Sequence, residues 1–353
     1  MIRYLLAKLL LIEAMLLCVP IVVALLNLKN DFVVKDSPTV FLSLFATIAI
    51  LLVLGGIGSF FKPKDFHIYA KEGVLIVALC WILWSFFGAL PFVFSGQIPN
   101  IIDAFFEVSS GFTTTGATIL NDVSVLSPSL LFWRSFTHLI GGMGVLVFAL
   151  AIMDNNKNSH LEVMKAEVPG PVFGKIVSKL KNTAQILYYL YLALFFLFVI
   201  IYFRAGMPLY DSFIIAMGTA GTGGFTVFND GIAHYHSTLI TYLVSFGVLV
   251  FGVNFNLYYY IMLRKFKAFF GDEELRTYLM IVGVSSLLIA CNIFHLYHNF
   301  ADSFEMSFFQ VSNVITTTGF GFGNTVDWPL FSQFLLLLSL IHISEPTRRV
   351  VIS

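Results

Sequence analysis

The sequence predicts an all-α polytopic membrane protein, with about eight membrane spans and three re-entrant pore helices in pseudo-repeated helix–pore-loop–helix units around a central pore. Of 353 residues, 58% are hydrophobic and only 11% are charged, whereas soluble domains carry about 25% charged residues. Eight apolar runs approach the length that a bilayer requires. Three shorter apolar runs each precede a Thr/Gly-rich segment, and runs of this length are typical of re-entrant helices.

The spans are expected where about 20 apolar residues follow one another. Lys8 lies within the first of them, and its long side chain is expected to reach the membrane interface. No small-residue cleavage site follows this N-terminal run, so we expect it to be retained as a helix. In chain order, the expected spans cover residues 4–28, 40–61, 74–94, 130–153, 186–203, 237–263, 278–300 and 328–343.

The distribution of basic residues predicts the orientation. With the N-terminus inside, the inner segments hold sixteen of the twenty Lys and Arg residues, as the positive-inside rule requires. The three Thr/Gly segments then all lie on the outer side. The inner segments are 1–8, 62–72, 154–182, 264–276 and the C-terminal tail.

The three Thr/Gly segments form an internal repeat. The first and third read Thr-Thr-Thr-Gly, ending at Gly116 and Gly319, and the second is a degenerate Ala-Gly-Thr-Gly ending at Gly223. The apolar runs before the first and third align without a gap, which places Glu107 opposite Gln310. Glycine spacings of 107 and 96 residues predict pseudo-symmetric units around a shared axis. The predicted pore helices cover residues 101–112, 212–219 and 304–315.

This repeat predicts a cation pore. Non-helical backbone at membrane depth persists only where protein buries it or where it lines a watery cavity. If the copies meet at one axis, their carbonyl groups can replace the water shell of a cation, and glycine allows those carbonyls to align. A surface turn would explain one such segment, but three aligned copies on the same side favour a pore. The predicted ion-binding residues are Thr114, Thr115, Gly116, Thr222, Gly223, Thr317, Thr318 and Gly319.

Acidic residues are expected to give the outer mouth a negative field that attracts cations. Asp122, Asp230 and Asp327 each follow one of the Thr/Gly segments and are the predicted mouth acids. Further acids of the outer segments would add to the same field; they are Asp103, Asp211, Asp302 and Glu305.

No pattern in the sequence indicates an enzyme, a cofactor or a nucleic-acid partner. Arg134 and His138 stand four residues apart near the outer end of a span. A membrane-embedded enzyme using them is the alternative, but the spans hold no clustered acid/base pair. We expect Arg134 to anchor the span at the interface or to bond to pore-helix carbonyls. His234, His236, His295 and His298 are expected to be interface histidines rather than metal ligands.

These motifs resemble the TrkH/KtrB/HKT superfamily of potassium transporters. The resemblance rests on the three filter segments, on Trp133-Arg134-Ser135 and on the glycines between 141 and 144. Two extra N-terminal helices and the segment 166–171 resemble the bacterial TrkH branch. The resemblance implies a bacterial inner (plasma) membrane protein with a cytoplasmic N-terminus, which conducts K⁺ and forms homodimers. A glycine in the first filter, here Gly116, accompanies K⁺ selectivity in this family.

The resemblance also implies a cytosolic nucleotide-binding partner of the TrkA/KtrA type, which the basic loops 154–182 and 264–276 could dock. The positive-inside rule explains the charges of these loops equally well.

The predicted organisation departs from the family in its last third. We expect two N-terminal helices in 1–65, pore repeats in 66–160, 161–270 and 271–343, the last incomplete, and an atypical tail in 344–353. A fourth repeat is absent, which favours a truncated chain over a pore completed by another chain. The predicted function is a potassium uptake transporter subunit. The alternative is a non-conducting fragment or membrane interaction subunit.

Overall fold

The computed structural model describes residues 2–26, 36–60, 63, 70–142, 144, 180–323, 325 and 327–344, and within these ranges it contains helices and loops but no β-strand. The chain divides into two compact units, Met1–Tyr188 and Tyr189–Ser353. The division falls within a helix of the predicted second repeat, and the predicted repeat boundaries remain predictions.

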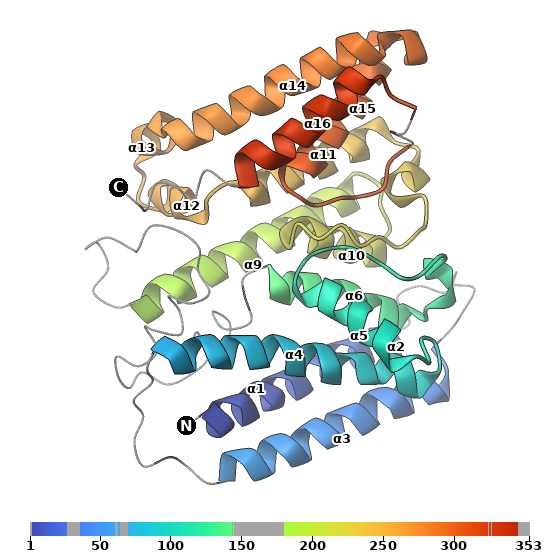
Figure 1. Cartoon of the computed structure of the whole chain (residues 1–353), viewed down its shortest axis with the longest axis vertical. Coiled ribbons are helices and arrows are strands. Elements are labelled where there is room, and N and C mark those ends of the chain that lie inside the picture. The colour runs from blue at the N-terminus through green and yellow to red at the C-terminus, as the bar shows by residue number, and fades with distance from the viewer. Residues whose placement is uncertain are drawn as a thin grey trace. The chain divides into compact units, whose positions relative to one another are not determined.

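The first unit contains the N-terminal helices and the first predicted repeat. Helix α1 packs along α3 and α4, and the short helix α5 lies against α4 and α6 (Figure 1). The two helices α5 and α6 therefore form a hairpin held against the long helix α4. The bounds are α1 Ile2–Leu16, α2 Cys18–Leu26, α3 Pro38–Phe60, α4 Ala70–Ser95, α5 Ile101–Phe112 and α6 Pro128–Gly141.

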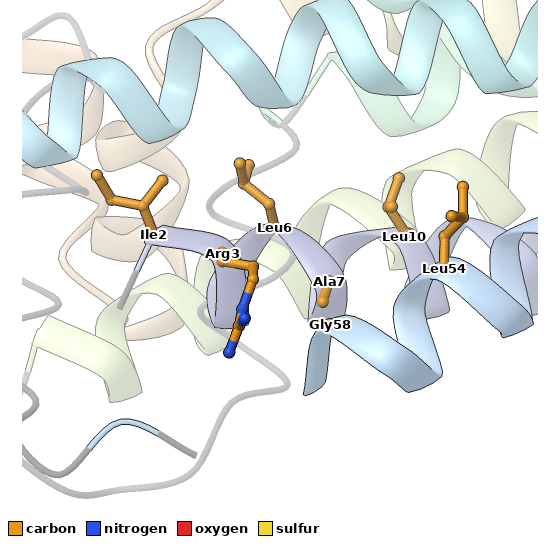
Figure 2. A pocket seen from close by; sticks show the side chains of 7 residues that line it. All are labelled: Ile2, Arg3, Leu6, Ala7, Leu10, Leu54 and Gly58. Atoms are coloured by element: carbon orange, nitrogen blue, oxygen red, sulfur yellow. The ribbon is translucent and has the colours of Figure 1, made fainter. Parts of the chain in front are cut away.

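The first expected span is found, but it is interrupted at Leu17, between α1 and α2. Pro20 accounts for the interruption, because proline has no N–H and its ring collides with the carbonyl four residues earlier. Near the start of α1, an open groove of about 350 Å³ lies along α1 and α3. Leu6 and Leu10 of α1 and Leu54 of α3 line it with apolar side chains (Figure 2).

The second unit contains most of the second predicted repeat and the third. Helix α14 packs on α15 and α16, and α15 also contacts α11 (Figure 1). Ile289 and Ile293 of α14, Val311 of α15 and Trp328 form the buried centre of this packing. The bounds are α9 Leu180–Arg204, which crosses the division, α10 Leu209–Ala220, α11 Thr238–Gly252, α12 Phe255–Met262, α13 Phe266–Gly271, α14 Glu273–Tyr297, α15 Phe300–Ile315 and α16 Leu330–Ser344.

Five of the expected spans are helices long and apolar enough to cross a membrane, within the described part of the chain. They are Ile2–Leu26, Pro38–Phe60, Lys71–Ser95, Gln185–Arg204 and Glu273–Tyr297. The span expected at 130–153 ends as a helix at Gly141, where Gly142 is the C-cap. Its remainder beyond residue 144 lies outside the described residues. The last expected span is the helix Leu330–Ser344, which begins after Pro329.

The single span expected at 237–263 is wrong, because the helix stops at Gly252 and restarts at Phe255. Val253 is extended, with ψ 143°. Two tyrosine hydroxyls donate to carbonyls near the break, from Tyr258 to Val250 (2.5 Å) and from Tyr278 to Leu249 (3.3 Å). Backbone carbonyls freed inside a membrane need such partners, and these hydroxyls supply them at a break where the sequence reads Gly252-Val253-Asn254.

The span expected at 278–300 is displaced toward the N-terminus and covers Glu273–Tyr297. His298 ends it in the left-handed conformation, with φ 54°. The side chain of Asn299 then accepts a hydrogen bond from the Ala301 N–H (3.1 Å) and starts α15. Phe300 therefore belongs to the pore helix and not to the span.

Candidate ion-coordinating loops

Three short helices lead into the Thr/Gly segments. They are α5, α10 and α15, which end at Phe112, Ala220 and Ile315, at intervals of 108 and 95 residues. The prediction for α5 is confirmed at both ends. The other two begin earlier than expected, at Leu209 and Phe300.

The backbone after each helix follows one conformational pattern. Thr114, Thr222 and Thr317 have φ of 54°, 49° and 57°. Two residues later, Gly116, Gly224 and Gly319 have φ of 74°, 79° and 73°. A β-branched residue with positive φ is an outlier, and such strain costs about 1–3 kcal/mol and concentrates at functional sites. Its recurrence in three loops marks them as one motif.

This pattern corrects the expected register of the second loop by one residue. Gly224, and not Gly223, has the conformation of Gly116 and Gly319. The hydrogen bonds agree, because the N–H groups of Thr115, Gly223 and Thr318 donate to the carbonyls of Ser110, Gly218 and Asn313. The intervals are therefore 108 and 95 residues and not 107 and 96. Two adjacent glycines in the second segment left the sequence alignment ambiguous.

Paired hydroxyl groups explain why the second loop looks degenerate. The hydroxyl oxygens of Thr113 and Thr115 lie 2.8 Å apart, and those of Thr316 and Thr318 lie 2.7 Å apart. In the first pair, Thr113 donates to the Ser109 carbonyl (2.8 Å), so Thr115 must donate to Thr113. The second loop has glycine at both positions, 221 and 223. Since the two hydroxyls bond to each other, they are absent together.

Left-handed residues at alternate positions alter where the carbonyl groups point. In a regular strand, successive residues face opposite sides, and positive φ at every second residue interrupts that alternation. Each loop can therefore present several carbonyl oxygens to one cation. The negative end of the dipole of the preceding helix also lies at each loop and adds to the attraction of the carbonyl oxygens for a cation.

The second and third loops contact each other within the second unit. Gly224 lies against the carbonyl of Thr318, so closely that a Cβ atom there would overlap it. Further along, the Ile232 N–H donates to the Gly321 carbonyl (2.9 Å). The ring of Phe320 from the third loop lies against Gly218 of α10, where a Cβ atom would be 2.9 Å from it. These contacts pair the two loops.

Glu107 and Gln310 form hydrogen bonds to the segments that follow the first and third loops. The Glu107 carboxylate accepts from the Ile119 N–H (3.0 Å) and from the Thr118 hydroxyl (2.8 Å). Gln310 donates to the Phe322 carbonyl (2.7 Å). Both side chains thus reach the backbone twelve residues ahead. Their alignment was visible in the sequence, but neither was predicted as a site residue.

Arg134 is buried and so is not the exposed interface anchor that the sequence allowed, and it forms an ion pair that the sequence did not predict. Its Nε atom lies 2.6 Å from the Glu107 carboxylate, and their side chains are only 3% and 0% exposed. The neighbouring His138 is also buried. Arg134 therefore joins α6 to the pore helix α5 through an ion pair.

The three predicted mouth acids are all exposed. Asp122 caps a short 3₁₀ helix by accepting from the Ser124 N–H (2.9 Å). Asp230 occupies the equivalent position and lies 3.4 Å from His234. Asp327 stands in the turn before α16.

Asp211, which was expected to add to this field, is only 1% exposed and lies in the first turn of α10. Its carboxylate lies beside Tyr235, which ends the 3₁₀ helix Gly231–Tyr235. Burial first, and then the carboxylates of Asp211 and Asp230, raise the pKa of Tyr235. Tyr235 therefore remains a neutral phenol, and Asp211 is buried beside it, unlike the three exposed acids.

Comparisons with known proteins agree with this architecture. Residues 41–341 match the family described as TrkH, cation transport protein. The Trk system potassium uptake protein TrkH of Escherichia coli (strain K12) is 36% identical over 287 residues, which cover 79% of this chain and 59% of that protein. The protein of the same name from Salmonella typhimurium is 36% identical over 279 residues, covering 76% of this chain and 57% of the relative.

A solved structure is similar over nearly the whole chain. The crystal structure of the potassium transporter TrkH from Vibrio parahaemolyticus superposes with a TM-score of 0.81 at 28% identity, covering 96% of this chain and 69% of that one. The chain spans less than two thirds of the length of the curated relatives described above. Its match over residues 41–341 nevertheless covers most of the sequence, and the chain belongs to the TrkH family of cation transport proteins.

Proposed function

We propose that this chain is a channel-like subunit for potassium uptake, which conducts K⁺ down its electrochemical gradient through backbone carbonyls of the Thr/Gly loops. One observation carries the proposal: three loops, each at the C-terminal end of a short helix, share left-handed residues at the same two positions. The relatives named as potassium uptake proteins support K⁺ as the ion.

The proposed ion-binding residues follow the corrected register. In the first and third loops they are Thr114, Thr115, Gly116, Thr317, Thr318 and Gly319. In the second loop they are Thr222, Gly223 and Gly224, with Gly224 in the position of Gly116. The exposed Asp122, Asp230 and Asp327 are proposed to concentrate cations at the mouth.

The remaining parts of the proposal concern the setting of the chain. We place it in the bacterial inner membrane with a cytoplasmic N-terminus, as a homodimer that needs no organic cofactor and carries out no enzymatic reaction. The exposed Arg264, Lys265 and Lys267 around α13 support docking of a cytosolic nucleotide-binding regulator of the TrkA/KtrA type. The other proposed docking loop, 154–182, lies mostly outside the described residues.

Growth on low K⁺ tests the proposed function. The chain would be expressed in cells that lack potassium uptake, beside a chimera that continues after residue 341 with the corresponding segment of the Escherichia coli relative. We expect the chimera to restore growth and Rb⁺ uptake, because its added segment brings it to the length of the Escherichia coli relative. Growth with the relative but with neither the chain nor the chimera would contradict the proposal.

A further inference from the structure

Glu13 is a buried acid within the first membrane helix segment. Its side chain is 0% exposed, and neither carboxylate oxygen has a hydrogen-bond partner among the described residues. It also forms no ion pair there. Acidic residues inside membrane spans are rare and costly, and they mark functional positions.

The carboxyl group lies next to the end of the first pore helix. Opposite Glu13, helix α4 has a glycine, and a Cβ atom on Gly88 would be 3.3 Å from the Glu13 Oε1 atom and 3.3 Å from the Phe112 ring. The same Cβ atom would be 3.0 Å from Val108. Phe112 is the last residue of α5 and immediately precedes the first Thr/Gly loop. Glu13 is therefore separated from that loop by one layer of side chains.

A hydrogen-bond donor is buried in the same place. Trp84 lies one turn before Gly88 on α4 and is 0% exposed, and its indole N–H has no acceptor among the described residues. Its ring centre lies 5.5 Å from that of Phe112. Because neither group has a partner within hydrogen-bond distance in the described part of the chain, the carboxyl oxygen and the indole N–H complement each other through one bridging water molecule.

The helices packed against α1 supply no cation to balance a charge on Glu13. Helix α3 has no titratable residue, and on α2 the only one, Cys18, is exposed. On α4, Lys71 and Glu72 stand in the first turn, and Cys80 is buried two turns before Gly88.

The hairpin α5–α6, which packs against α4, adds two ionised groups that neutralise each other. Glu107 of α5 and Arg134 of α6 form their own buried ion pair. The remaining titratable side chains of these helices are Asp103, in the first turn of α5, and His138, which is buried on α6. On α1 itself, Lys8 is exposed, with its ammonium 5.7 Å from the centre of the Tyr4 ring, and Arg3 is also exposed. A bare carboxylate at Glu13 would therefore be buried without compensation, which is strongly unfavourable.

We propose that Glu13 is a proton-binding site, in which one water molecule links the neutral carboxylic acid to the Trp84 indole behind the end of α5. The bound proton stabilises the packing of α1 against α4 and α5. Loss of the proton places a charge in this layer and loosens it. The inference concerns the chain itself and does not depend on the proposed K⁺ pathway.

Infrared spectroscopy of the purified full chain tests the site directly. At neutral pH we expect the carbonyl band of a protonated carboxylic acid, shifted by deuterium exchange. Glu13→Gln keeps the shape of the side chain but removes the acid, so the band should vanish. The control Glu273→Gln changes an exposed acid in the first turn of α14 and should leave the band unchanged. A wild-type protein without this band, or a Glu13→Gln variant that retains it, would overturn the proposal.

Two further variants keep the test decisive if Glu13→Gln does not fold. Trp84→Phe removes the donor, so the band should move to higher frequency, and an unchanged position would refute the contact with the indole. Glu13→Asp retains an acid with a shorter side chain and should also shift the band. In the wild type, the contribution of Glu13 to thermal stability should fall as pH rises above the ordinary carboxyl range of about 4.3, because the folded state still binds the proton there and the unfolded state does not. The fall should end at the pH at which the infrared band itself titrates. A band that titrates with no loss of stability would contradict the proposed role in packing.

Discussion

At the residue scale, the shape of the three Thr/Gly loops depends on threonines that adopt a conformation unfavourable to them. Thr114, Thr222 and Thr317 are β-branched, and a left-handed conformation costs about 1–2 kcal/mol for an L-residue. The surrounding hydrogen bonds must fix each of them, since the N–H two residues before each glycine donates to the end of the preceding helix. Two residues later in each loop, the left-handed position is occupied by glycine, which adopts that conformation without strain.

The corrected register makes a prediction that separates two adjacent glycines. Gly224→Ala places a Cβ atom against the Thr318 carbonyl at a φ of 79°, so we expect a loss of about 1–2 kcal/mol or more, with weaker discrimination of K⁺ from Na⁺. Gly223→Ala should cost less, because Thr115 and Thr318 occupy the equivalent positions. Rb⁺ and Na⁺ uptake by the chimera, with thermal denaturation of the purified chain, measures both. Equal effects of Gly224→Ala and Gly223→Ala on stability and ion discrimination would contradict the corrected register of the second loop.

The buried ion pair makes a second prediction. Glu107→Gln leaves the Arg134 guanidinium without its counter-charge, and removing one partner of a buried pair costs about 3–5 kcal/mol. The double variant Glu107→Gln with Arg134→Leu should recover much of this loss, because Gln310 serves the third loop without an arginine partner. Denaturation midpoints of the two variants provide the measurement. A single variant as stable as the wild type would show that the pair does not hold the first loop.

At the element scale, close contact between α5 and α6 positions the first loop. Gly141 of α6 lies against the carbonyl of Phe112 at the end of α5, and a Cβ atom there would also be 3.1 Å from Thr114. Gly111 of α5 faces Thr137 of α6 in the same way. The two helices can approach this closely only because glycine has no side chain.

Gly141→Ala should therefore displace the end of α5 together with Thr114. Because the nearest atoms are backbone, we expect a cost at the upper end of the roughly 1–3 kcal/mol typical of overpacking. Gly56→Ala in α3 is the matched control, since no atom lies within 4 Å of its Cβ position. The control should equal or slightly exceed the wild type in melting temperature. A melting temperature for Gly141→Ala equal to that of the control would contradict this packing.

At the scale of the whole molecule, apolar length and repetition predicted most of the architecture. Residues 101–112 form a helix as expected, and five spans form helices over the expected apolar runs, although the one expected at 278–300 begins and ends earlier. The break after Gly252 was not predicted, although Asn254 stands beside it, and the Tyr278 hydroxyl that bonds to the Leu249 carbonyl is remote in sequence. The register of the second loop failed for a similar reason, since only the contact of Gly224 with Thr318 distinguishes it from Gly223.

The charged residues of the site were predicted less well than its backbone. A sequence pattern shows that Arg134 lies in an apolar run, but the partner, Glu107, comes from another helix. Asp211 and Asp230 look alike in the sequence, and burial alone separates them. Tertiary packing therefore decides which of these acids are exposed.

We propose above all that backbone carbonyls of the Thr/Gly loops, and not the acids Asp122, Asp230 and Asp327, hold the transported cation. Anomalous diffraction from crystals of the chain soaked in Tl⁺, a heavy substitute for K⁺, tests it most directly. We predict Tl⁺ in contact with carbonyl oxygens of residues 222–224 and 317–319. Tl⁺ found only at Asp122, Asp230 or Asp327, with none at the loops, would contradict the account.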